Sequence, residues 1–157
     1  MQLKPAMNYY LKGKTPEAWI DYAIECGFRC MEITVSHLPE ERSRQDEIIA
    51  LARAKGFELS LHSAFGKNNI IDTDEEKRVK SIAQAKAAID LAASHDLRCV
   101  TFHPGRLSSE EESVQEKWEQ LLKTVGEAVL FFSVLPLKVG NDCLFLYQFT
   151  CKVGEEY

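Results

Sequence analysis

The sequence predicts an α/β protein with parallel strands, and three observations lead to this class. Segments with helical periodicity alternate with short segments rich in β-branched and aromatic residues. Two of the expected strands end in a histidine, which is typical of a site built at the carboxyl edge of a parallel sheet. The composition, 45% hydrophobic and 27% charged, is that of an ordinary globular domain, and 157 residues suffice for one core.

The first elements follow from capping and breaking residues. The opening segment QLKPAMNYY is expected to be a strand, and Pro5 restricts it to a sheet edge or a strand beginning. A helix is predicted after Thr15, which is a suitable N-cap, with Pro16 at its first position and Gly27 as its terminator. Residues 28–35 then have the composition of a second strand.

Two further helix and strand pairs are expected. A helix over residues 44–55 precedes the predicted strand FELSLHSAF. A longer helix is expected from about Asp74, because Thr73 and Glu76 have the spacing of a capping box and apolar residues then recur every three or four positions. The segment RCVTFHPG is the fourth predicted strand.

The fourth helix has the clearest apolar stripe of the chain, and Ser109 with Glu112 offers a second capping box before it. Its apolar positions are Val114, Trp118, Leu121, Leu122, Val125 and Val129. The predicted order βαβαβαβα implies parallel strands joined by right-handed crossovers. Periodicity leaves open whether the sheet is doubly wound or a barrel, and no Gly-x-Gly-x-x-Gly turn follows the first strand to favour a dinucleotide fold.

Charge and cysteine content narrow the range of partners and compartments. A net charge of −5 opposes binding to nucleic acid, which requires clustered Lys and Arg. The five cysteines form no Cys-x-x-Cys pair and are expected to be free thiols in a reducing compartment. The N-terminus lacks a signal-peptide core, and the apolar stretch 128–137 is shorter than a membrane span. We therefore expect a cytoplasmic protein with a small-molecule substrate and no membrane partner.

The candidate metal ligands are His62 and His103, at the carboxyl ends of the third and fourth predicted strands. Neutral imidazoles on adjacent parallel strands can converge on one divalent ion, for which zinc or manganese is the expected choice. Taken singly, each histidine is more simply a core or rim residue bonded to backbone. Their equivalent positions favour a functional pair.

Three more residues are candidates for the same edge. Glu32, near the end of the second strand, is the candidate catalytic residue. The alternative interpretation is that Glu32 is a solvent-facing carboxylate or an ion-pair partner of Arg29. Asn69 and Arg106, in the loops after the third and fourth strands, are candidate substrate-binding residues. The alternative for Asn69 is a turn position, whereas Gly105 allows backbone to approach a ligand closely.

Two segments, LSLHSAFGKNNIID and DEEKRVKSIAQAKAAIDLAASHDLRCVTFHPG, resemble the xylose isomerase-like TIM barrels. This superfamily includes sugar phosphate isomerases and epimerases, hydroxypyruvate isomerase-like enzymes and apurinic endonucleases of the endonuclease IV type. The resemblance covers about residues 1–129. It implies that His62 and His103 are metal ligands, as in endonuclease-type members, or line the substrate and metal pocket, as in isomerase-type members.

The resemblance also implies an incomplete structure. Members of the family carry a Glu at the end of the fifth strand and further ligands on later strands, and Asp142 is at best a poor third ligand here. We expect residues 1–129 to form the N-terminal half of a TIM barrel, about four βα units, and residues 130–157 to be a divergent apolar and aromatic tail of a truncated or frame-altered product. A half-barrel exposes two sheet edges, which a second copy in a homo-oligomer would cover.

The expected activity is metal-assisted isomerisation or epimerisation of a small hydroxycarbonyl or sugar substrate, impaired by truncation. One alternative is an endonuclease IV-like phosphodiesterase, although a basic, aromatic-interleaved stripe is missing. The other is a non-catalytic fragment or interaction module.

Overall fold

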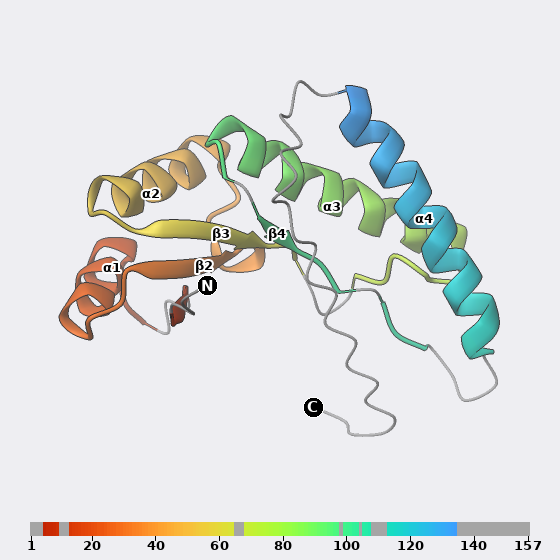
Figure 1. The fold of residues 1–157 in the computed structure, drawn as a ribbon, viewed down its shortest axis with the longest axis horizontal. Coiled ribbons are helices and arrows are strands. Elements are labelled where there is room, and N and C mark those ends of the chain that lie inside the picture. Colours follow the sequence, from red (N-terminus) through yellow and green to blue (C-terminus); the bar gives the residue numbers. More distant parts are fainter. Residues whose placement is uncertain are drawn as a thin grey trace.

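The computed structural model describes residues 5–9, 13–64, 68–97, 99–103, 105–107 and 113–134. Four strands alternate with four helices in these ranges (Figure 1). Their bounds are β1 Ala6–Tyr9, α1 Pro16–Glu25, β2 Cys30–Thr34, the 3₁₀ turn η1 Val35–His37, α2 Arg42–Ala54, β3 Glu58–His62, α3 Glu75–Ser94, β4 Val100–Thr101 and α4 Val114–Val134.

The strands form one parallel sheet in the order β1-β2-β3-β4, so each strand lies beside its neighbour in sequence. Each connection contains one helix, and this arrangement confirms the predicted α/β class. β4 is shorter than predicted from RCVTFHPG, because only Val100 and Thr101 pair with β3.

Helix beginnings depend on single side chains, as predicted for α1. The Thr15 hydroxyl accepts a hydrogen bond from the Ala18 backbone N–H at 3.2 Å. The cap of α3 differs from the expected one, because Asp74, and not Thr73, accepts bonds from the backbone N–H groups of Glu76 and Lys77. A carboxylate at this position also interacts favourably with the helix dipole.

The start of α4 lies one turn later than the expected capping box. Ser113 accepts a hydrogen bond from the Glu116 N–H at 3.4 Å, whereas Ser109 and Glu112 fall outside the described residues. The helix continues to Val134 and therefore runs through the expected boundary between residues 129 and 130. The expected tail beyond it, including Asp142, also falls outside the described residues.

The two faces of the sheet differ in chemistry. Register places Met31, Ile33 and Leu61 on one face, where they are buried against α1, α2 and α3. Alternation directs the neighbouring residues of each strand to the other face. That second face carries polar side chains from all four strands, namely Asn8, Glu32, Thr34, Ser60, His62 and Thr101.

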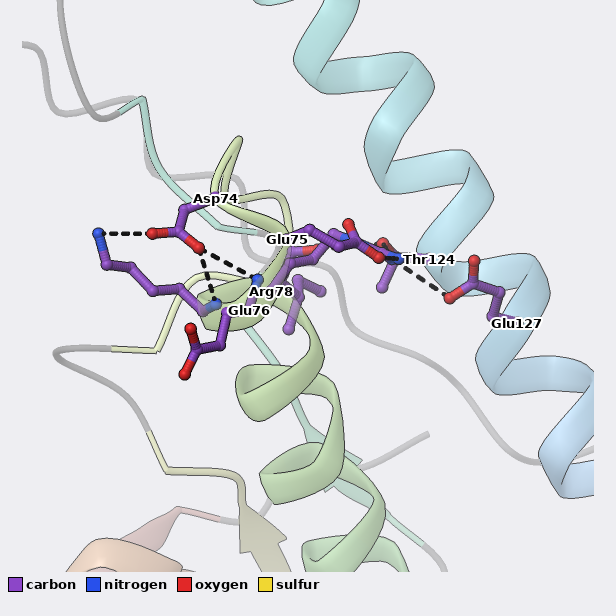
Figure 2. Close-up of polar contacts among 8 residues, drawn as sticks. Asp74, Glu75, Glu76, Arg78, Thr124 and Glu127 are labelled. Atoms are coloured by element: carbon purple, nitrogen blue, oxygen red, sulfur yellow. Dashed lines mark hydrogen bonds and ion pairs between the residues drawn. The ribbon is translucent and has the colours of Figure 1, made fainter.

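A buried arginine joins α3 to α4 (Figure 2). Arg78 is only 4% exposed, and its guanidinium donates to Glu75 on its own helix and to Thr124 and Glu127 on α4, the last at 3.2 Å. These charge-assisted bonds raise the pKa of Arg78, with the Glu75 hydrogen bond as the largest cause.

The predicted apolar stripe of α4 is buried only in part. Leu121 is buried, whereas Val114, Trp118 and Leu122 are exposed at 68%, 43% and 56%. Within the described residues, no helix is both long and apolar enough to cross a membrane.

Candidate metal and substrate site

The two predicted histidines meet at the carboxyl edge of the sheet. His62 is the last residue of β3 and lies level with Thr34 of β2 and Thr101 of β4. His103 follows two residues after Thr101 and therefore returns to the same face. The centroids of the His62 and His103 rings are 4.9 Å apart, and their planes are inclined at 53°.

The tautomer of His62 is set by its neighbour in sequence. Its Nδ1 lies 2.9 Å from the carbonyl oxygen of Ser63, which accepts a hydrogen bond and has none to donate. Nδ1 therefore carries the proton, and Nε2 carries the lone pair that a metal ion would use.

The environment of His103 favours a neutral ring. Partial desolvation of the ring lowers its pKa, the nearby His62 lowers it further, and the carboxylate of Glu32 opposes both effects. Because a metal binds only unprotonated imidazole, a lowered pKa keeps His103 available as a ligand at neutral pH.

Glu32 faces this pair from β2 and has polar neighbours on both sides. Its Oε1 accepts a hydrogen bond from the Thr101 hydroxyl at 3.0 Å, and its Oε2 accepts one from the Asn8 amide at 3.4 Å. The alternative partner, Arg29, donates instead to the carbonyl of Phe28. Sequence reasoning missed Asn8 and Thr101, because only strand register shows that they share a face with Glu32.

The structure brings Asn69 and Arg106 together, through backbone and not through the arginine side chain. Asn69 is buried, and its amide donates to the Arg106 carbonyl at 2.9 Å while its oxygen accepts from the Arg106 N–H at 3.1 Å. Gly105 was expected to let the backbone approach a ligand closely. In the structure, the backbone at Gly105 lies close to the side chain of Asn69, and its φ angle is +111°. Asn69 therefore holds the loop after β4 in place, and Arg106 is exposed at its surface.

Helix α4 fixes the loop that carries Asn69. The ammonium group of Lys117 donates to the Ile71 carbonyl at 2.8 Å, and the Thr124 hydroxyl donates to the Ile70 carbonyl at 3.0 Å. Ser81 of α3 accepts from the Asn69 N–H at 2.9 Å. A small, partly enclosed hollow lies between this loop and His103.

The metal-ligating side chains among the described residues supply only part of a binding site for a divalent ion. No group of three or more His, Cys, Asp and Glu residues converges among the residues that the structure describes. Two imidazole nitrogens are short of the three protein ligands that catalytic zinc sites usually have. His37 and His95 bond elsewhere, to the Tyr9 carbonyl at 3.0 Å and to the Asp46 carboxylate at 2.7 Å. His95 is thus held against α2.

The family is now evident from comparison. The model of the xylose isomerase-like TIM barrel family matches residues 20–133, which is more than half of the chain. The protein therefore belongs to this family. No curated protein matches the chain in sequence.

Solved structures show the same fold at low identity. A D-tagatose 3-epimerase-like protein superposes with a TM-score of 0.68 and 19% identity over 83% of this chain and 49% of its own. A D-psicose 3-epimerase has a TM-score of 0.68 and 14% identity over the same shares. Endonuclease IV from Thermus thermophilus has a TM-score of 0.53 and 17% identity, covering 79% of this chain and 46% of its own. The chain thus spans about half the length of these proteins and forms part of a TIM barrel.

Proposed function

We propose that this protein carries the N-terminal half of the site of a sugar isomerase or epimerase acting on a small hydroxycarbonyl or sugar substrate. The observation that carries the proposal is the 4.9 Å approach of His62 and His103 at the ends of adjacent strands, beside the Glu32 carboxylate. Two of the similar structures are named as sugar epimerases, which supports this substrate class. A cytoplasmic location is part of the proposal.

His62 and His103 are the proposed ligands of a divalent ion, zinc or manganese. When bound, such an ion supplies Lewis-acid polarisation of the substrate carbonyl. Glu32 is the proposed proton-transfer residue, and the bonds from Thr101 and Asn8 orient its carboxylate. Arg106 is the proposed contact for an anionic substituent of the substrate, with its backbone held by Asn69.

Calorimetry tests the metal site directly. Zinc or manganese is titrated into the chelator-treated chain and into the His62→Ala/His103→Ala double variant at neutral pH and near pH 5.5. We expect weak binding by the unaltered chain, because two ligands fall short of a complete set, and further weakening in acid as protons compete. The double variant should bind less. Identical isotherms for the two proteins would remove both histidines from the site.

A phosphodiesterase of the endonuclease IV type is the second candidate, favoured by the likeness to the Thermus structure. The net charge of −5 weighs against it, because duplex binding depends on neutralising phosphates. Metal-dependent cleavage of abasic DNA by the purified chain, abolished in the double variant, would reverse the ranking. If neither metal binding nor turnover is found, a non-catalytic interaction module is the remaining function.

A further inference from the structure

The segment that carries His103 is anchored on both sides of this residue. Two residues before it, the Thr101 carbonyl accepts a hydrogen bond from the Ser63 N–H at 2.9 Å, which ties the segment to the end of β3. Three residues after it, the N–H and the carbonyl of Arg106 both bond to the side chain of Asn69, at 3.1 and 2.9 Å. The place of the His103 backbone therefore depends on β3 at one end and on Asn69 at the other.

The two bonds to Arg106 use both ends of one amide group. The Asn69 nitrogen donates to the Arg106 carbonyl while the Asn69 oxygen accepts from the Arg106 N–H, so the pair of bonds fixes orientation as well as distance. The same oxygen accepts from the Ile71 N–H at 3.4 Å, and Asn69 is only 3% exposed. This amide is thus engaged with backbone and buried away from the surface that a substrate would reach.

Helix α3 fixes the backbone of Asn69. The Ser81 hydroxyl accepts from the Asn69 N–H at 2.9 Å and donates to the Lys77 carbonyl at 2.8 Å. Ser81 is itself buried. Because its hydroxyl proton is used within α3, the oxygen of Ser81 is held in one orientation as the acceptor for Asn69.

Helix α4 holds the two residues that follow Asn69. The Thr124 hydroxyl donates to the Ile70 carbonyl, the Lys117 ammonium group donates to the Ile71 carbonyl, and both donors are buried. Groups supported by packed helices are placed more precisely than groups supported by loops alone. The side chain of Asn69 therefore bonds to the loop after β4 from a base that two helices make rigid.

We propose that Asn69 is a positioning residue that sets the His103 ring against the His62 ring, and that it is not a contact for the substrate. The 4.9 Å separation of the two rings then results from β3, which carries His62, and from the bonds of Asn69 to the segment of His103. The consequence for metal binding rests on the function proposed above. The placement of the ring does not depend on that function.

Nuclear Overhauser spectroscopy of the full chain in chelator measures this placement without any metal. The rings of His62 and His103 are close enough to give a cross-peak, and the His62→Ala/His103→Ala variant identifies their signals by loss. In Asn69→Ala the cross-peak should weaken by at least about twofold, because it falls steeply with distance and the ring is then not held to within about 0.5 Å. Asn68→Ala is the matched control and should leave the cross-peak unchanged, since the Asn68 amide donates to the Ala64 carbonyl of its own loop.

Two further variants separate placement from stability. Ile49→Val removes a buried methylene group from α2, so it should lower stability and leave the cross-peak unchanged. If far-ultraviolet circular dichroism shows that Asn69→Ala is unfolded, Asn69→Asp takes its place. Aspartate keeps the size of asparagine and an acceptor for the Arg106 N–H but has no N–H group for the Arg106 carbonyl, so the cross-peak should weaken in the same direction.

An unchanged cross-peak in a folded Asn69 variant would overturn the proposal, and so would the absence of the cross-peak from the unaltered chain. Equal weakening in Asn68→Ala would show that the loop as a whole, and not the Asn69 amide, places the ring. Equal weakening in Ile49→Val would show that general stability places it. Either result would also reject a positioning role for Asn69.

Zinc titration of the same variants tests the consequence for the proposed metal site. Asn69→Ala should bind zinc about tenfold more weakly than Asn68→Ala, as is typical when a residue that supports a ligand is removed. Equal zinc affinity in these two variants would reject a role of Asn69 in metal binding. If the unaltered chain binds no zinc, the proposed metal site is rejected, and the cross-peaks still decide whether Asn69 places His103.

Discussion

Replacing Gly105 with alanine perturbs the loop after β4 at the point where it packs against Asn69 and Ile71 of the loop after β3. The Cβ atom would lie 2.4 Å from Cγ1 of Ile71 and 2.6 Å from Oδ1 of Asn69. Carbon atoms in favourable contact are about 3.5–4.0 Å apart, so the neighbours would have to move by about 1 Å or more. The oxygen that would be displaced is the one that accepts from the Arg106 N–H.

Two costs combine at this position. Overpacking a filled site typically costs about 1–3 kcal/mol. The backbone φ of +111° adds about 1–2 kcal/mol for a residue with a Cβ atom. We therefore expect Gly105→Ala to lower the free energy of unfolding by about 2–5 kcal/mol.

Urea denaturation followed by circular dichroism measures this change, with Gly126→Ala as the control. Gly126 lies inside α4 with nothing within 4 Å of the position that a Cβ atom would take, so alanine should stabilise the protein by about 0.5–1 kcal/mol. Opposite signs for the two substitutions are the expected result. A neutral Gly105→Ala would refute the close packing between this loop and Asn69.

Three further predictions concern charged groups. Arg78→Leu should lower the free energy of unfolding by about 2 kcal/mol in the same denaturation assay. This loss is smaller than for a fully buried ion pair, because the carboxylate partners of Arg78 are exposed. The control Lys77→Ala, which removes an exposed ion pair, should change the free energy of unfolding by no more than about 0.5 kcal/mol. Asp74→Ala should cost about 1 kcal/mol and lower the melting temperature through loss of the α3 cap. The pKa of His103 is lowered by folding, so the unfolded chain binds its proton first and stability should fall as pH drops below about 6.5. In metal-free unfolding titrations at pH 7.5 and 5.5, the His103→Asn variant should lose less stability between the two pH values than the unaltered chain does. An equal loss in the two proteins would show that other groups cause the pH dependence.

Much of the candidate site could be predicted from the sequence, for a geometric reason. Parallel strands place their carboxyl ends at one edge, so a histidine at the end of each of two successive strands predicts proximity without any knowledge of packing. The approach of His62 and His103 confirms that proximity, and their role as ligands remains a proposal. The surroundings of Glu32 were not predictable, because its partner Thr101 lies 69 residues away in sequence.

The order of helices and strands and the family of the fold could both be read from the amino-acid sequence. These properties depend on local signals, such as the Thr15 cap and the apolar periodicity, that act over a few residues. The bonds from Asn69 to the backbone of Arg106 and the exposure of an apolar face on α4 became known only from the folded structure. The hydrogen-bond partner of a buried amide and the burial of a helix face depend on which segments meet in space, and sequence spacing does not contain that information.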